Sequence, residues 1–248
     1  MISLFFAFFI FGLIVGSFLN SVIYRLEQGQ GFVKGRSFCP NCKYQLSWQD
    51  LIPVFSFLLL RGKCRYCQKS ISWQYPLVEL STGLIFLLIY NLQFTIYNFI
   101  IAPFLIIIFV YDLKHYIIPD KIIYPAIAIV FVYDLLKSNF QWKSDFLLSA
   151  LGAAGFFLAI VLISRGKGMG IGDIKLAFLM GLFLGWPNII AALFSAIFLG
   201  AIMGIALIIS GKKTLRSEVP FGPFLTAGTF LALFWGGKII NFYLNLFQ

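Results

Sequence analysis

Long apolar segments separated by short polar connections dominate this chain. A window of about 20 residues, the length of helix that crosses a hydrocarbon layer about 30 Å thick, finds eight such segments. They are residues 4–24, 76–92, 96–110, 122–136, 146–164, 174–186, 189–210 and 221–246. Segments of this kind are typical of helices surrounded by lipid. The pattern therefore predicts an all-α polytopic membrane protein with about eight transmembrane helices.

The composition excludes most other classes of protein. Of the 248 residues, 60% are hydrophobic and 11% are charged, and the mean hydropathy is +0.93. Soluble domains average roughly 45–50% apolar and 25% charged residues. One soluble core of this size could not bury 30 Phe and five Trp, and disordered or disulfide-rich secreted chains are excluded as well. The first segment lacks a basic start and a small-residue cleavage site, so we expect a retained span, not a signal peptide.

The positive charge follows the topology. Sixteen Lys and Arg fall in alternate connections, beginning with the one after the first segment, and only two fall on the opposite side. The positive-inside rule therefore predicts both termini outside and the basic loops in the cytoplasm. The net charge of +10 is not concentrated on a basic face interleaved with exposed aromatic residues, so no nucleic-acid partner is expected. Anionic lipid headgroups are the more natural partner of these loops.

Three regions follow from this pattern: a first transmembrane helix (1–24), a cytoplasmic loop domain (25–75) and a seven-helix membrane domain (76–248). The loop domain holds all four cysteines, in two C-x-x-C pairs: Cys39, Cys42, Cys64 and Cys67. In a reducing cytosol thiolates favour a metal over a disulfide, which predicts a structural zinc knuckle with four sulfur ligands. Two redox-active or unpaired C-x-x-C units are the alternative.

Two aspartates mark the cytoplasmic edge of the predicted helices. Asp112 ends the third segment, and Asp173 begins the sixth. A carboxylate pair that shares one proton can hydrolyse a peptide bond, because the ionised group takes a proton from water while the protonated group polarises the carbonyl oxygen. Helix ends would favour Asp112 as the acid and Asp173 as the base. The alternative is two unrelated acids that flank helices at the membrane interface.

Alternating glycines precede Asp173. Gly168, Gly170 and Gly172, together with Lys175, are candidate residues of a loop that admits an extended substrate, and a flexible linker is the alternative. Neither a P-loop nor a dinucleotide-binding pattern is present. Asp120 follows a proline and is expected to cap a helix, whereas Glu79 has a structural or functional role that the sequence leaves open.

These motifs resemble the bacterial type IV prepilin peptidases. The similar stretches are Gly16-Ser-Phe-Leu-Asn20, both cysteine pairs, Tyr75-Pro-Leu-Val-Glu-Leu80, Asp112 with Ile118-Pro-Asp120, and Gly168-Met-Gly-Ile-Gly-Asp-Ile-Lys175. The resemblance implies an intramembrane aspartic endopeptidase of the GxGD type. Its substrates would be prepilins or pseudopilins of type IV pili, type II secretion or competence, cut after a glycine at the cytoplasmic face of the bacterial inner membrane.

The resemblance also assigns residues and cofactors. Asp112 and Asp173 match the family's catalytic pair, and the four cysteines match its zinc positions. Many members methylate the new N-terminus with S-adenosylmethionine, for which this sequence shows no binding pattern. Three other classes compete: a presenilin-like protease, which should lack the cysteine loop; a proton-coupled transporter; and a non-catalytic scaffold, in which both aspartates would be replaceable.

Overall fold

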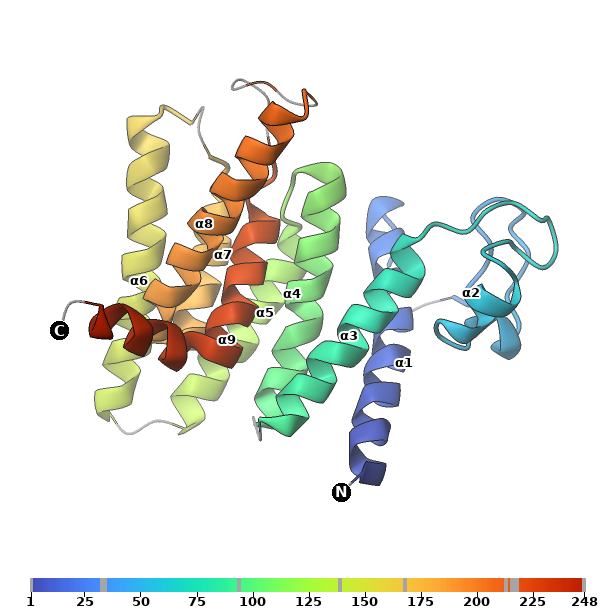
Figure 1. The fold of residues 1–248 in the computed structure, drawn as a ribbon, viewed down its shortest axis with the longest axis horizontal. Helices are drawn as coiled ribbons and strands as arrows, with labels where there is room; N and C mark the ends of the chain where they lie inside the picture. Colours follow the sequence, from blue (N-terminus) through green and yellow to red (C-terminus); the bar gives the residue numbers. More distant parts are fainter. Residues whose placement is uncertain are drawn as a thin grey trace. The chain divides into compact units, whose positions relative to one another are not determined.

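The computed structural model describes residues 2–31, 35–92, 95–137, 140–166, 169–211, 214 and 219–246. It divides into two compact units, Met1–Ile107 and Ile108–Gln248, with the boundary inside helix α4 (Figure 1). Among these residues the regular structure is helical, apart from the isolated β-bridges Phe38↔Gln45 and Lys63↔Ser70. The prediction of an all-α protein is therefore confirmed.

Each predicted span corresponds to one helix. The first unit holds α1 (Ile2–Glu27), the 3-10 helix η1 (Trp48–Leu51), α2 (Phe55–Leu59), α3 (Gln74–Asn91) and the first part of α4 (Ile96–His115). The second unit holds the end of α4, α5 (Asp120–Lys137), α6 (Phe140–Ile163), α7 (Ile171–Leu184), α8 (Asn188–Ile209) and α9 (Gly222–Asn245).

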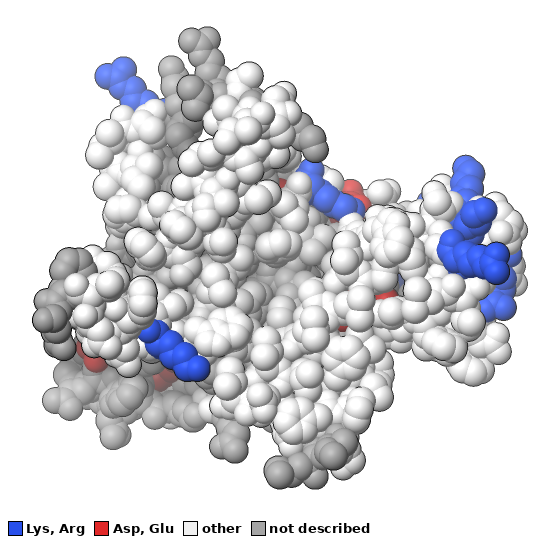
Figure 2. Space-filling view, in the orientation of Figure 1, with Lys and Arg blue, Asp and Glu red and all other residues white. Residues whose placement is uncertain are grey.

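Five of the described helices are long and apolar enough to cross a membrane. These candidate spans are Ser3–Glu27, Ile96–His115, Asp145–Ile163, Asn188–Ile209 and Gly222–Asn245. The protein is therefore a multi-pass membrane protein, and the full count of eight spans stays a prediction. Figure 2 shows Lys and Arg side chains gathered on the part of the first unit that connects α1 with α3.

Helices α1 and α3 pack closely through small residues. A Cβ atom placed on Gly12 would lie 2.7 Å from the Cα atom of Gly83, and one on Gly16 would lie 2.7 Å from the Cα atom of Glu79. Only glycine permits this backbone approach, and Gly12 and Gly16 have the small-x-x-x-small spacing that is typical of close helix packing.

Helix α7 is the central helix of the second unit, because it contacts α5, α6, α8 and α9. It has only 14 residues and ends at Leu184, two residues before the predicted end. Gly185 terminates it with a φ of +64°, a conformation that glycine adopts without strain, and Pro187 follows. The second half of α7 is buried, and in its more exposed first turn Asp173 is buried as well.

Candidate functional site

Asp112 lies in the last turn of α4, and only 4% of its surface is exposed. The backbone amide of Gly222, the first residue of α9, hydrogen-bonds its carboxyl group. A Cβ atom on Gly222 would lie 2.5 Å from Oδ2 of Asp112, so the site requires a residue without a side chain at this position. The C-terminal end of α4 and the start of α9 together enclose this carboxyl group.

Asp173 lies in the first turn of α7 and is 8% exposed. Its Oδ2 accepts a hydrogen bond of 3.3 Å from the backbone N–H of Gly170, the residue that caps the helix. This contact satisfies one of the amides that a helix start leaves unpaired, and the positive end of the helix favours a carboxylate there. Local structure thus fixes where the Asp173 carboxyl group points.

The side chain of Ile118 links the surroundings of the two aspartates. A Cβ atom on Gly172 would lie 3.1 Å from Cβ of Ile118, and one on Gly222 would lie 3.4 Å from its Cδ1. Gly172 precedes Asp173, and Gly222 contacts Asp112, so both carboxyl groups border the same small region of the second unit. The charge of Asp112 also acts on Asp173. Two acids that are 61 positions apart in the sequence therefore belong to one site.

Lys175 pairs with Asp120. Its Nζ atom lies 2.6 Å from Oδ1 of Asp120 and 4.9 Å from the ring centre of Tyr124. Asp120 is the first residue of α5 and has a partner on α7, which adds to the capping role expected from the sequence. The contact joins the segment that follows Asp112 to the turn that carries Asp173.

The glycine-rich segment is described only in part. Gly168 lies outside the described residues. Gly170 has an extended conformation, with φ −82° and ψ 154°, and Gly172 lies against Ile118. Both glycines thus have a role in packing or capping within this unit, and their contact with a substrate stays a prediction.

His115 lies against Tyr111, with ring centres 4.5 Å apart.

The four cysteines come together in the first unit. Their sulfur atoms all lie within 4.8 Å of one another, and the Sγ atoms of Cys39 and Cys67 are 3.9 Å apart. A tetrahedral zinc site with bonds of about 2.3 Å would place its sulfur atoms roughly 3.8 Å apart. The cluster could hold a metal ion with little rearrangement. It contains no disulfide.

Two similar turns build this cluster. In the first, the N–H of Cys39 donates to the carbonyl of Tyr44; in the second, the N–H of Cys64 donates to that of Lys69, each at 2.9 Å. The residue after each pair, Lys43 or Gln68, has a positive φ. Burial opposes ionisation of the Cys39 thiol, but backbone amides that donate to its sulfur outweigh burial and lower its pKa to about 7. A thiolate is the form that binds a metal.

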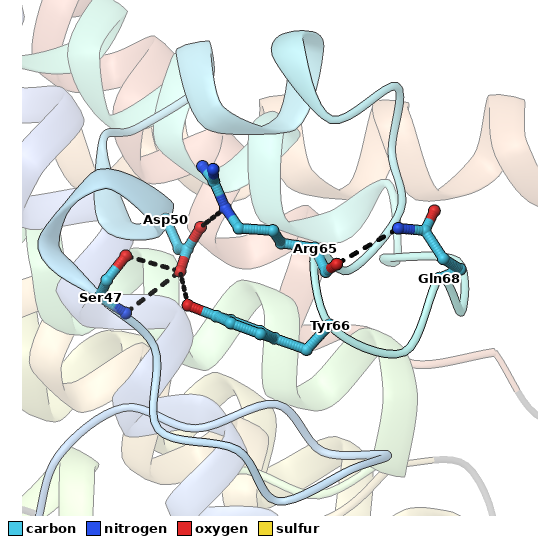
Figure 3. A network of polar contacts seen from close by, with 5 residues as sticks. All are labelled: Ser47, Asp50, Arg65, Tyr66 and Gln68. Atoms are coloured by element: carbon cyan, nitrogen blue, oxygen red, sulfur yellow. Dashed lines mark hydrogen bonds and ion pairs between the residues drawn. The ribbon is translucent and has the colours of Figure 1, made fainter.

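Asp50, which belongs to η1, ties the second of these turns to that helix (Figure 3). Its carboxylate accepts hydrogen bonds from the Ser47 hydroxyl at 2.8 Å, from the Arg65 side chain at 2.8 Å and from the Tyr66 hydroxyl at 3.2 Å. Burial raises the pKa of Asp50, but these donors outweigh it and hold the pKa below the usual value. Because Arg65 and Tyr66 lie between Cys64 and Cys67, the network fixes the second cysteine turn.

Comparison with known proteins gives the family. Residues 10–93 match the Bacterial Peptidase A24 N-terminal domain, and residues 99–205 match the Type IV leader peptidase family. Over 243 residues the chain is 35% identical to a Prepilin leader peptidase/N-methyltransferase of Bacillus subtilis (strain 168), covering 96% of this chain and 97% of the relative. The chain belongs to the type IV leader peptidase family.

Other relatives in the leader peptidase family carry the same name. The protein from Aeromonas hydrophila is 32% identical over 273 residues, covering 96% of this chain and 93% of the relative. The protein from Legionella pneumophila is 32% identical over 271 residues, covering 95% and 93%. No solved structure matches the chain significantly. The resemblance noted from the motifs is confirmed.

One residue of the candidate site has no clear sequence signal. Gly222 lies beyond the residues that match the family model and contacts Asp112. Ile118 belongs to one of the motif stretches, but its position between the surroundings of the two aspartates is visible only in the structure. A glycine next to prolines, in Pro220-Phe-Gly-Pro223, indicates only a break between helices. The sequence does not reveal that this break lies on the carboxyl group of another helix.

Proposed function

We propose that this protein is an intramembrane aspartic endopeptidase that removes the leader of type IV prepilins or pseudopilins. Its relatives, named Prepilin leader peptidase/N-methyltransferase over nearly the whole chain, support the substrate class and the N-methylation that follows cleavage. The observation that carries the chemistry is the pair of buried carboxyl groups, Asp112 and Asp173, on either side of Ile118. None of these relatives is named a transporter, so that interpretation has no support among them.

The proposed reaction uses both carboxyl groups and one water molecule. The ionised aspartate takes a proton from water as the oxygen attacks the carbonyl carbon, and the protonated aspartate donates to the carbonyl oxygen. The resulting tetrahedral intermediate collapses when its C–N bond breaks and the leaving nitrogen receives a proton. The two carboxyl groups then again hold one proton between them. Nearby acids share a proton in this way because both cannot easily ionise together.

Helix ends do not by themselves divide the roles of the two acids. The C-terminal end of α4 disfavours a negative charge on Asp112, as expected from the sequence. The N-terminus of α9 and the amide of Gly222 favour one, however, so the two effects oppose each other at this carboxyl group. At Asp173 the start of α7 and the Gly170 amide act in the same direction. Because the surroundings favour a negative charge more clearly at Asp173 than at Asp112, we propose Asp173 as the base in the first step and Asp112 as the protonated acid.

The proposed topology has eight spans in the bacterial inner membrane, with the aspartates at the cytoplasmic face. The distribution of Lys and Arg supports this orientation. In this topology residues 1–24 form the first transmembrane helix, residues 25–75 the cytoplasmic loop domain and residues 76–248 the membrane domain. A prepilin with a cytoplasmic basic leader and an apolar helix in lipid would reach this site with its scissile bond at the interface, since the bilayer limits the orientations that it can adopt.

Two cofactors belong to the proposal. Zinc would bind Cys39, Cys42, Cys64 and Cys67 as a structural ion, which the sulfur distances and the absence of a histidine or carboxylate in the cluster support. S-adenosylmethionine would supply the methyl group for the new N-terminus. None of the described residues is assigned to binding it.

Cleavage of a co-expressed prepilin tests the peptidase. Asp112→Asn and Asp173→Asn should each lower cleavage at least about a hundredfold, because each removes one half of the acid and base pair. Asp145→Asn, which changes an exposed acid at the start of α6, is the matched control and should process normally. Full processing by either of the first two variants would reject the pair.

A further inference from the structure

The residue before α2 is hydrogen-bonded to α3. The backbone N–H of Val54, the residue before α2, donates to Oε2 of Glu79 at 2.7 Å. Glu79 belongs to α3, and its Cα atom lies against Gly16, which is inside the candidate membrane span Ser3–Glu27. This hydrogen bond ties the cysteine-containing connection to the beginning of α3, and Figure 1 shows α2 beside that end of α3.

The side chains of α2 that do not face the protein are apolar. Phe57 is its buried residue, packed beneath Gly62 and against the ring of Trp73 with ring centres 5.0 Å apart. Phe55, Leu58 and Leu59 are 56%, 63% and 66% exposed. A short helix in a polar loop would normally turn polar groups outward. Here both faces are apolar, so the outer face is suited to a nonpolar environment.

Neighbouring residues extend this outer face. Trp48 in η1 is 72% exposed, and Leu51 in the same helix is 39% exposed. Helix η1 contacts α2. We call Trp48, Leu51, Phe55, Leu58 and Leu59 the loop patch. Tryptophan is the residue most typical of the boundary between lipid and water, where its ring is buried and its N–H stays near the headgroups.

Basic residues border the loop patch. Arg61, Lys63, Arg65 and Lys69 follow α2 in the sequence, and Figure 2 shows positive side chains gathered on this part of the first unit. Between residues 25 and 75 the acids are Glu27 and Asp50, of which Asp50 is already paired with Arg65. An apolar patch with a basic border complements an anionic lipid surface.

We propose that the loop patch inserts into the headgroup region of the membrane that α1 and α3 cross, with the basic border on anionic headgroups. The cysteine loop would then be attached to the bilayer at a third place, in addition to the two helices at its ends. This attachment does not depend on the proposed peptidase activity. Tethering by α1 and α3 keeps the patch next to lipid, so even a small gain per side chain would hold it there.

Fluorescence quenching by lipids tests the insertion in the full-length protein. The substitutions Trp73→Phe, Trp142→Phe, Trp186→Phe and Trp235→Phe leave Trp48 as the sole tryptophan. This variant is reconstituted into vesicles of phosphatidylcholine and phosphatidylglycerol. Interfacial helices bury their apolar face about 5–10 Å deep, so bromine near the headgroups should quench Trp48 about twofold more than bromine near the chain ends. Equal emission with and without brominated lipid would overturn the proposal.

A tryptophan elsewhere in the loop gives the matched control. Tyr44 is exposed but stacks on Tyr66, outside the loop patch, with ring centres 3.7 Å apart. In a Trp48→Phe chain with the same four substitutions, Tyr44→Trp should escape lipid quenching and respond to aqueous acrylamide. Equal lipid quenching at both positions would mean that the whole loop touches lipid and would reject the patch.

A second measurement avoids the tryptophan substitutions. A diazirine reagent confined to the bilayer should label the peptide 48–60 of the unsubstituted protein, and Leu58→Ser with Leu59→Ser should lower that labelling severalfold. Absence of label on this peptide, with normal label on α1, would overturn the proposal. It would favour another protein surface as the occupant of the patch.

Discussion

The ammonium group of Lys175 lies 2.6 Å from the carboxylate of Asp120, and this contact joins α7 to α5 beside the aspartate pair. Lys175 follows Asp173 by two positions, and Asp120 follows Asp112 by eight. The Asp120 side chain is 59% exposed and that of Lys175 is 26% exposed. An exposed ion pair of this kind contributes about 0–1 kcal/mol to stability. The pair is expected to matter more for positioning α7, because misplacement of a catalytic group by about 1 Å can lower the rate about a hundredfold.

Removing this ion pair should therefore affect rate more than folding. We expect Lys175→Met to lower kcat for prepilin cleavage about tenfold while the melting temperature changes little, because the first turn of α7 loses its tie to α5. Asp120→Lys with Lys175→Asp should recover part of the loss by restoring an opposite pair. Lys121→Met, one position from Asp120, is the control. A wild-type kcat in Lys175→Met would show that the pair does not position Asp173.

Gly222 gives a sharper test of the site. In Gly222→Ala the new methyl group would lie 2.5 Å from Oδ2 of Asp112, closer than any real contact, so the carboxyl group or α9 must move. We expect a loss of cleavage of at least about tenfold with the helical fold retained, since the change is confined to the site. Gly237→Ala, in the same helix with no atom within 4 Å of the added carbon, should cleave normally. Equal activity of the two variants would contradict this account.

The cysteine cluster should hold one metal ion per chain. Metal analysis of the purified protein should find zinc, and Cys64→Ser should lose it, because three thiolates and a hydroxyl bind zinc less well than four thiolates. Thiol titration of the metal-free protein should then find reactive cysteines where the loaded protein has none. A purified protein with no metal and four reactive thiols would contradict the zinc assignment.

Asp50 should stabilise the cysteine loop at neutral pH. Its pKa is lower in the folded protein than in an unfolded chain, so its contribution is complete above the unfolded value of about 3.9 and is lost as the pH falls through the folded value. Asp50→Asn should lower the stability of the loop by about 1–3 kcal/mol at pH 7, as expected for hydrogen bonds to a charged group. Hydrogen exchange of residues 35–73 at several pH values measures this.

The control for Asp50→Asn is Gln49→Ala, which changes the exposed neighbour in η1. It should leave exchange in the loop unchanged at every pH. Equal effects of the two substitutions at pH 7, or a difference that grows as the pH falls, would show that the hydrogen-bond network in Figure 3 does not stabilise the loop.

Apolar length and motif spacing predict much of this fold. Each of the eight predicted segments forms one helix, and five of the described helices are long and apolar enough to cross a membrane. The small-residue spacing of Gly12 and Gly16 predicts close helix packing, and the structure identifies α3 as the partner of α1 there. Helix ends were less predictable. The sequence predicts that α6 starts at residue 146, whereas the helix begins at Phe140 in the structure. Polar residues can extend a helix beyond its apolar part.

Contacts between distant segments could not be predicted from the sequence. Pairing of Lys175 with Asp120 depends on which helices adjoin α7, and hydropathy gives no neighbours. The same holds for Glu79, which accepts a hydrogen bond from the backbone of Val54 in the cysteine loop and another from the Ser17 side chain. An acid in an apolar segment indicates that some partner exists, but any backbone amide can serve. Sequence patterns thus identify the acids, and only the fold identifies what holds them.

The amide of Gly222 lies on Asp112 although it comes 17 residues after position 205, the last residue that matches the family model. A gene fragment that stopped after α8 would encode both aspartates, all four cysteines and every family motif. It would still lack the backbone that closes one side of the carboxyl group. Counting motifs would classify such a fragment as an intact enzyme, whereas the geometry classifies it as a broken one.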